Sequence, residues 1–221
     1  MPVRENVAAV RSRIAAACSR AGRRTDAVTL IAVSKTFPAS AVDEAIDAGI
    51  TAIGENRVQE AREKRPLVRA AAPAVWHLIG HLQSNKAKEA VRLFDVIQTV
   101  DSLELAGKIA RAAEIEGKRQ EILLEVNIGG EAQKNGATKG VIPDLAAAVK
   151  AMPSLHLRGL MAIPPVGTPD QTRPYFRELR GLRDELGLEH LSMGMSEDFD
   201  VAIEEGATLV RVGRAIFGSR G

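Results

Sequence analysis

The feature of this sequence that most constrains its fold is a repeated alternation between short apolar segments and longer segments with helical signals. Eight apolar segments have the length and aliphatic composition of buried parallel strands. They are Val28–Val33, Thr51–Gly54, Val75–Ile79, Asp95–Val100, Ile122–Asn127, Leu157–Ile163, His190–Met193 and Leu209–Val212. The fourth segment is the weakest strand candidate, because Asp95 and Gln98 make it polar.

The segments around these strand candidates carry helix signals. Apolar residues recur at helical spacing from Val3 to Ala21, and Gly22 ends the pattern, which predicts a helix before the first strand. The charged run of residues 62–65 is expected on a solvated helix face. Further helices are predicted between Pro38 and Gly49, and over Asn85–Phe94, Leu103–Gly117, Ile142–Met152, Pro174–Leu186 and Glu197–Glu205.

Eight strand–helix units in 221 residues predict an α/β fold, a compact (β/α)8 TIM barrel with an extra N-terminal helix. A doubly wound open sheet is the structural alternative. No linker, low-complexity tract or break in composition divides the chain, so we expect one domain over residues 1–221. The Pro-rich stretch of residues 163–169 follows the sixth strand, on the face where barrel active sites lie.

Composition excludes several classes of function. The 30 basic and 28 acidic residues leave a net charge of +2, and aromatic residues make up 3% of the chain, so nucleic acid is not an expected partner. Cys18 is the single cysteine and is expected in the core. His156 and His190 have no metal-ligand spacing. No segment approaches the ~18 apolar residues of a membrane span, and the start lacks a signal peptide, so we expect a cytoplasmic protein.

A lysine stands at the end of the first strand candidate. Lys35 follows the apolar run and Ser34. A lysine amine reacts with a carbonyl only when it is unprotonated, and burial or a nearby cation favours that form. Taken alone, Lys35 is more often a solvated loop residue. Lys86, Lys134 and Lys139 are rival nucleophiles, but none follows so clear a buried strand.

Two small-residue turns follow the seventh and eighth strand candidates, where barrels often bind phosphate. The Ser196 hydroxyl and the N–H groups after it can face an anion. Gly213 allows close approach of the backbone, and the N–H of Arg214 can donate. Separately, Ser196 is an N-cap and Gly213 a turn. Together with Lys35 they suggest a ligand that carries both an aldehyde and a phosphate, namely pyridoxal 5'-phosphate.

Arg211 lies two residues before Gly213, so the two residues share a face of the eighth strand. An arginine inside a barrel is costly unless it has a partner. One partner is the pyridine nitrogen of the cofactor, which would stay unprotonated and leave the ring a weaker electron sink. The other is a structural ion pair, for which Glu125 is a candidate.

The chain resembles the pyridoxal phosphate homeostasis protein family, which is related to the N-terminal barrel of bacterial alanine racemases. The resemblance covers essentially the whole chain, because its segments run in family order from residue 32 to residue 218. Arg57 departs from the pattern, since the family often carries a tyrosine there, and this change would alter the rim of the pocket. The matching segments are Ala32–Lys35, Gly54–Glu60, Trp76–Lys86, Ser192–Ser196 with Asp198, and Val210–Gly218.

The resemblance implies roles for the residues already singled out. Lys35 would hold pyridoxal phosphate as an internal aldimine, and Arg211 would face the pyridine nitrogen. Ser196, Gly213 and Arg214 would bind the phosphate, the last two through their backbone.

Three further cofactor-binding residues follow from the resemblance alone. Asn56 and His77 would line the cofactor, and Met193 would lie beside its ring. Alanine racemases continue into a second domain that supplies a catalytic tyrosine, whereas Tyr175, the single tyrosine here, lies in a predicted helix. A two-base racemase needs acids on both faces of its substrate.

We therefore expect a non-catalytic protein that buffers pyridoxal phosphate or delivers it to apo-enzymes. A monomer without bound metal is expected. A weak pyridoxal phosphate-dependent amino-acid racemase is the alternative function. A Schiff-base aldolase is a third possibility, since that chemistry also uses a barrel lysine.

Overall fold

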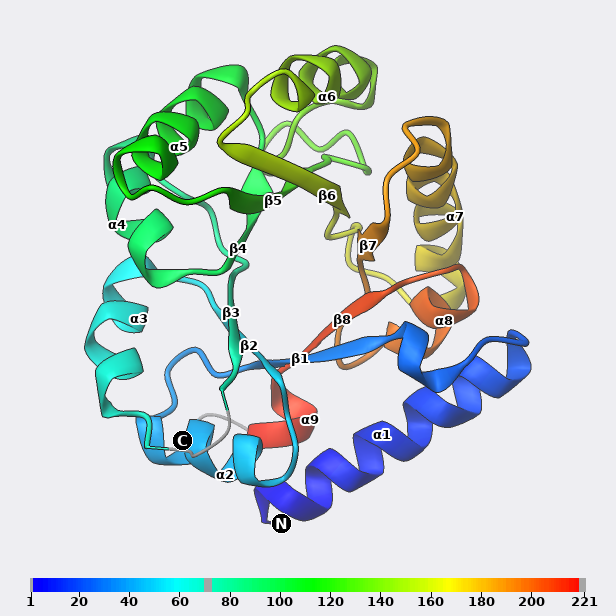
Figure 1. Ribbon diagram of the computed structural model, residues 1–221. Helices are drawn as coiled ribbons and strands as arrows, with labels where there is room; N and C mark the ends of the chain where they lie inside the picture. The colour runs from blue at the N-terminus through cyan, green and yellow to red at the C-terminus, as the bar shows by residue number, and fades with distance from the viewer. Residues whose placement is uncertain (1, 70–72, 219–221) are drawn as a thin grey trace.

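The computed structural model describes residues 2–69 and 73–218, and its strands form a closed parallel barrel (Figure 1). Each strand pairs with the next in chain order, and the last pairs with the first. This arrangement confirms the predicted barrel and excludes the open sheet. The strands are β1 (Thr29–Val33), β2 (Ala52–Glu55), β3 (Val75–Leu78), β4 (Val96–Val100), β5 (Gln120–Glu125), β6 (Leu155–Met161), β7 (His190–Ser192) and β8 (Leu209–Val212).

Helices surround the barrel and cover the outer faces of the strands (Figure 1). Short 3-10 helices occur at Thr25–Ala27, Arg65–Leu67, Ser84–Lys86 and Lys139–Val141. The α-helices of the described residues are α1 (Val3–Arg20), α2 (Ala39–Asp47), α3 (Val58–Lys64), α4 (Ala87–Leu93), α5 (Leu103–Ile115), α6 (Ile142–Lys150), α7 (Pro169–Glu185), α8 (Phe199–Glu204) and α9 (Arg214–Phe217). None of them is long and apolar enough to cross a membrane, as far as the described residues go.

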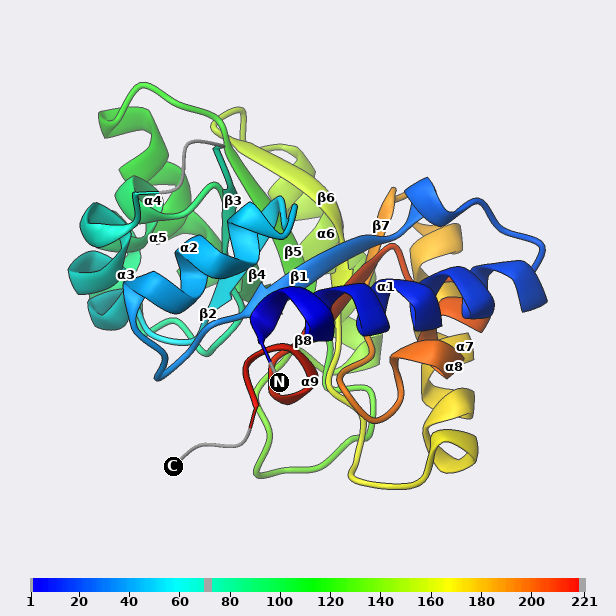
Figure 2. The same ribbon diagram turned by 90° about the horizontal axis from the view of Figure 1, so that it is seen from below.

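The predicted extra helix, α1, packs against α8, α9 and α2 on the outside of the barrel (Figure 2). Its apolar stripe is buried and includes Cys18, as expected for a small core residue. Burial raises the pKa of the Cys18 thiol, so the thiol stays protonated. The side-chain amide of Asn6 donates to the carbonyl of Ile216 over 2.8 Å, which ties α1 to α9.

Two apolar layers follow from the alternation of side chains along each strand. The larger layer fills the space between strands and helices. A smaller cluster fills the barrel interior and consists of Ile31, Ala52, Leu123, Met161 and Leu209. The interior also takes polar side chains, which make up the site.

The element boundaries differ from the predicted ones in a few places. Strand ends agree to within two residues. Helix α7 begins at Pro169 instead of Pro174, because Thr168 and Gln171 form a reciprocal capping box at the earlier point. Helix α8 begins after Asp198 instead of Ser196. Residues 1, 70–72 and 219–221 of the predicted domain lie outside the described residues, and the single domain stays a prediction.

Candidate functional site

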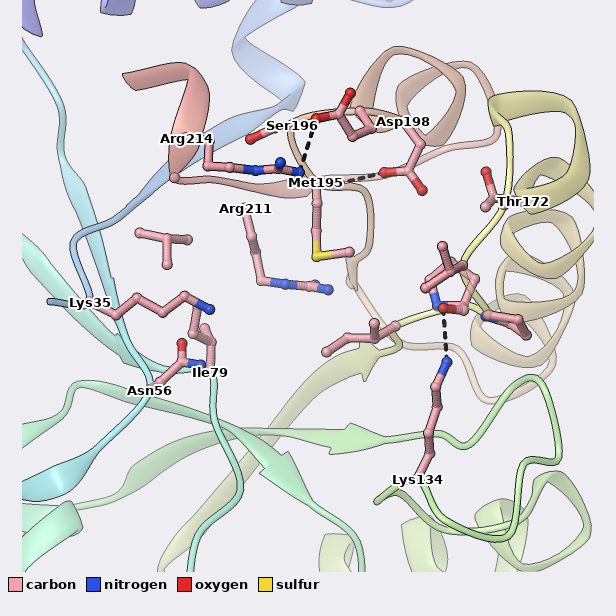
Figure 3. A pocket seen from close by; sticks show the side chains of 18 residues that line it. Lys35, Asn56, Ile79, Lys134, Thr172, Met195, Ser196, Asp198, Arg211 and Arg214 are labelled. Carbon is pink, nitrogen blue, oxygen red and sulfur yellow. Dashed lines mark hydrogen bonds and ion pairs between the residues drawn. The ribbon is translucent and has the colours of Figure 1, made fainter. Parts of the chain in front are cut away.

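A cavity of about 490 Å³ lies at the carboxyl ends of the strands (Figure 3). Its wall comes from the ends of β1, β2, β3 and β8 and from the loops after β5, β6 and β7. The structure therefore brings together side chains that are far apart in the sequence. The predicted site residues in its lining are Lys35, Asn56, Ser196, Arg211, Gly213 and Arg214.

Lys35 is the first residue of the tight turn after β1, and its side chain points into the cavity beside Asn56 (Figure 3). The next residue, Thr36, has a φ of 68°. A β-branched residue rarely adopts this left-handed conformation, because its side chain crowds the backbone. The N–H of Thr36 donates to the carboxylate of Glu60, so contacts from outside the turn hold the strained geometry in place.

A buried ion-pair network lies under this turn. The ammonium of Lys64 donates to Glu55 Oε1 over 2.6 Å, to Glu60 Oε1 over 2.8 Å and to the carbonyl of Ser34 over 2.8 Å. The hydroxyl of Ser34 also donates to Glu55 Oε1, at 2.6 Å. Burial raises the pKa of Glu55, and its hydrogen bonds with Lys64 and Ser34 oppose that change. The backbone on both sides of Lys35 is thus anchored to β2 and α3.

The prediction of a solvated face for residues 62–65 is wrong for Lys64, which is 6% exposed. Its neighbours Arg62 and Glu63 do form exposed contacts. Lys64 is buried because it lies one helical turn after Glu60, on the side of α3 that faces the end of β1. There the carboxylates of Glu55 and Glu60 compensate its charge.

Asn56 follows β2 and presents an unpaired acceptor to the cavity. Its Oδ1 is buried and accepts no hydrogen bond from the residues that the structure describes. The glycine at position 80 allows the backbone of Asn56 to come this close, because a Cβ on Gly80 would lie 2.2 Å from the carbonyl oxygen of Asn56. A buried acceptor of this kind costs free energy unless a ligand or a water molecule donates to it.

Arg211 extends from β8 into the barrel and is 4% exposed. Its Nη1 donates to Ser192 Oγ over 2.7 Å, and its Nη2 donates to the carbonyl of Ala162 over 2.9 Å. Burial lowers the pKa of Arg211 to about 10, so the guanidinium remains charged at neutral pH. Among the described residues, no ion pair joins Arg211 to Glu125. The structural pairing considered from the sequence is therefore replaced by hydrogen bonds to neutral groups.

The turns after β7 and β8 approach each other at one side of the cavity. Gly194 has a φ of 88°, and its carbonyl accepts from the N–H of Arg211 over 3.0 Å. The Asp198 carboxylate accepts from the N–H of Met195 over 2.7 Å. Within the described ranges, the N–H groups of Ser196, Gly213 and Arg214 have no acceptor. They can therefore bind an anion.

The comparisons with known proteins agree with this geometry. Residues 6–221 match the family described as "Alanine racemase, N-terminal domain". A pyridoxal phosphate homeostasis protein of Aquifex aeolicus is 43% identical over 223 residues, which cover 98% of this chain and 97% of the relative. Another, from Pseudomonas aeruginosa, is 45% identical over 221 residues, covering 99% and 96% of the two chains.

The chain belongs to the alanine racemase N-terminal domain family, and within it to the pyridoxal phosphate homeostasis proteins. A solved structure of PipY from Synechococcus elongatus, with pyridoxal phosphate bound, is also similar: the TM-score is 0.83 at 37% identity, over 98% of this chain and 100% of that one. The family resemblance and the racemase-like barrel predicted from the sequence are both confirmed.

Several members of the cavity wall were not singled out as site residues. Lys134, considered only as a rival nucleophile, faces the cavity from the side opposite Lys35 (Figure 3). Its amine donates to the carbonyl of Pro164 over 3.2 Å and pairs with Glu131 over 2.5 Å. Thr172 and Met195 also line the cavity. The Pro-rich loop of residues 163–169 contributes five wall residues, consistent with its expected place on this face.

The structure places His77 and Met193 apart from the other predicted residues. His77 lies within β3 and lines a second cavity of about 260 Å³ at the amino ends of the strands. Met193 is fully buried in the layer between strands and helices. Its neighbour Ser192 points inward, so Met193 points outward by the alternation of the strand. In the described ranges, no cluster of three or more His, Cys, Asp or Glu side chains is arranged to hold a metal ion.

Proposed function

We propose that this chain binds pyridoxal 5'-phosphate in the cavity at the carboxyl ends of the barrel and acts in pyridoxal phosphate homeostasis. The observation that carries the proposal is the convergence of an amine, a buried guanidinium and unpaired N–H groups around one cavity. The names of its full-length relatives and the ligand of PipY support the same cofactor.

The residues present fit the chemical groups of this cofactor. The amine of Lys35 suits its aldehyde, and the N–H groups of Ser196, Gly213 and Arg214 suit its phosphate. The unpaired Oδ1 of Asn56 suits a hydroxyl donor on the ring. Arg211 suits the ring nitrogen, because a guanidinium can only donate.

The chain's own residues also favour holding the cofactor over using it. When bound, the cofactor supplies an aldehyde that condenses with an amine and can withdraw electrons into its ring. Arg211 keeps its own proton, so the ring nitrogen would not be protonated and electron withdrawal would be weak. Tyr175 lies in α7 and is absent from the cavity wall. We therefore infer a buffering or delivery role without efficient turnover.

Three finer parts of this function stay predictions. Apo-enzymes that depend on pyridoxal phosphate are the proposed recipients of the cofactor. A monomer and a cytoplasmic location are expected from the sequence.

The decisive experiment locates the covalent attachment. The wild-type protein is loaded with pyridoxal phosphate, reduced with borohydride and mapped by peptide mass spectrometry. We expect a visible absorption band and an adduct at Lys35, and we expect Lys35→Ala to lose that adduct. Lys134→Ala is the matched control, because Lys134 lines the same cavity, and it should keep the adduct at Lys35.

Two outcomes would contradict the proposal. A wild-type protein without a visible band, even with excess pyridoxal phosphate, would overturn the cofactor assignment. Interconversion of alanine enantiomers that disappears in Lys35→Ala would overturn the non-catalytic role and favour the weak racemase.

A further inference from the structure

A continuous chain of hydrogen bonds crosses the barrel interior behind Arg211. Arg211 Nη1 donates to Ser192 Oγ over 2.7 Å, and the Ser192 hydroxyl donates to Gln98 Oε1 over 2.6 Å. Gln98 Nε2 lies 2.9 Å from His77 Nδ1. The four side chains come from β8, β7, β4 and β3, and none is more than 5% exposed. Four neighbouring polar residues are thus enclosed where aliphatic residues would ordinarily pack.

The donor at one end sets the direction of the whole chain. A guanidinium has only donors, so Ser192 Oγ accepts from Arg211 and directs its own proton to Gln98 Oε1. The amide nitrogen of Gln98 then faces His77 Nδ1, which must accept. His77 therefore carries its proton on Nε2 and is neutral. Burial lowers the pKa of His77 to about 4, which is consistent with this neutral tautomer.

The backbone of β4 is adapted to place Gln98 in this chain. The pairing of β4 with β5 runs from Ile97↔Ile122 to Val100↔Leu124. Two residues of β4, Gln98 and Thr99, thus lie opposite the single residue Leu123, which is a β-bulge. Bulges commonly redirect a side chain. Gln98, together with Asp95, is also what made this strand the weakest of the eight strand candidates in the sequence.

We propose that Gln98, acting with His77 through Ser192, is a positioning residue that holds the Arg211 guanidinium in one orientation toward the ring nitrogen of bound pyridoxal phosphate. The inference rests on the proposed cofactor binding. The carbonyl of Ala162 fixes the second nitrogen of Arg211, so the guanidinium is held from two sides. If the contact with Ser192 were lost, the Arg211 guanidinium could rotate about its remaining hydrogen bond to the carbonyl of Ala162.

The first test compares two buried glutamines. Gln98→Leu removes the middle of the chain, whereas Gln120→Leu removes a buried amide that binds the carbonyls of Phe94 and Asp95 and has no link to Arg211. We expect both variants to lose stability, because both glutamines are buried and hydrogen-bonded. We expect Gln98→Leu alone to shift the visible absorption maximum of the loaded protein and to release pyridoxal phosphate about tenfold faster, the effect of losing about 1.4 kcal/mol. Equal spectra and release rates in the two variants would overturn the proposal.

A second pair of variants tests the His77 end. His77→Asn keeps an acceptor close to the position of Nδ1, whereas His77→Leu leaves the Gln98 amide without one. We expect His77→Asn to retain the wild-type spectrum and release rate and His77→Leu to resemble Gln98→Leu. A His77→Leu variant that behaves like the wild type, together with a His77→Asn variant that behaves like Gln98→Leu, would show that His77 acts through packing alone.

A measurement on the cofactor-free protein separates this inference from the proposed function. The ¹⁵N NMR signals of His77 report which ring nitrogen carries the proton. We expect protonation on Nε2 only, and a change in these signals in Arg211→Lys, which cannot reproduce the two-sided contact. Protonation on Nδ1 would contradict the chain of donors, whether or not the cofactor binds. Failure of the wild-type protein to take up pyridoxal phosphate would instead refute the proposed function.

Discussion

Glu125 at the end of β5 is an acid whose surroundings oppose its charge. It is 7% exposed, and its Oε2 has no hydrogen-bond partner among the described residues. Burial, assisted by the charge of Asp101, raises its pKa to about 7, while Arg211 acts in the opposite direction. The carboxyl group is thus close to half-ionised at neutral pH. It lines a cavity of about 220 Å³ that shares Lys134 and Ile163 with the main one.

Replacement of Glu125 tests this placement through the pH dependence of stability. A raised pKa in the folded state means that the folded chain binds the proton more tightly than the unfolded chain does. Stability from this group is therefore lost as pH rises between about 4.5 and about 7. We expect the stability of Glu125→Gln relative to wild type to increase from about pH 5 to about pH 8, by up to roughly 3 kcal/mol. Urea unfolding at both pH values measures it, and a difference that does not change with pH would contradict the raised pKa.

At the scale of elements, a buried ion pair between Glu55 and Lys64 joins β2 to α3. Lys64 and Glu55 are both buried, and removal of one partner leaves the other charge uncompensated. The contact also holds the turn that carries Lys35, so its loss should affect cofactor retention as well as folding.

We expect Lys64→Met to reduce the free energy of unfolding by about 3–5 kcal/mol. The double variant Lys64→Met with Glu55→Gln should recover more than half of that loss, because the one carboxylate left from the network, that of Glu60, is partly exposed. Chemical denaturation of the three proteins gives the comparison. Lys108→Met, which breaks the exposed pair with Glu104, is the control and should change stability little. A double variant as unstable as the single one would mean that Lys64 acts through packing.

These elements also show how far the sequence predicts the structure. The strands were predictable because continuous apolar runs report burial on both faces. A run that is apolar on both faces does not indicate which of its side chains point into the barrel and which point outward. His77 and Met193 both lie in buried strands, and only the strand register shows that one points inward below the cavity and the other outward.

Buried polar contacts between elements were the least predictable part. Lys64 stands in a charged run whose composition suits a solvent-exposed face, and only its position under β1 reveals the carboxylates around it. The burial of Gln98 was unpredictable for a related reason. Its partners Ser192 and His77 are distant in the sequence, so only the polarity of Gln98 was visible there.

At the scale of the whole molecule, closure of the barrel depends on close contact between strand backbones. Gly159 of β6 pairs with His190 of β7, and a Cβ at position 159 would lie 2.1 Å from the carbonyl oxygen of His190. Backbone atoms cannot give way as a flexible side chain does. A side chain at this position would force the two strands apart.

We therefore expect Gly159→Ala to destabilise the protein by about 3 kcal/mol or more, through strain at the seam between β6 and β7. Gly107→Ala is the matched control, because position 107 lies in α5 and a Cβ there meets no atom within 4 Å. It should raise the free energy of unfolding by about 1 kcal/mol through helix propensity. Thermal and urea unfolding of both variants provide the measurement, and a neutral Gly159→Ala would show that the seam can widen.

The pairing of β1 with β8 has a consequence for the order of events during synthesis. Lys35 follows the first strand and Gly213 follows the last, and the two strands become neighbours only when the barrel closes (Figure 1). During vectorial synthesis the N-terminal part of a chain is available to fold first. The amine of Lys35 is thus made well before the backbone N–H of Gly213, which we propose to bind the phosphate. Tight binding of the cofactor through both groups would therefore require that β8 has been made and has paired with β1.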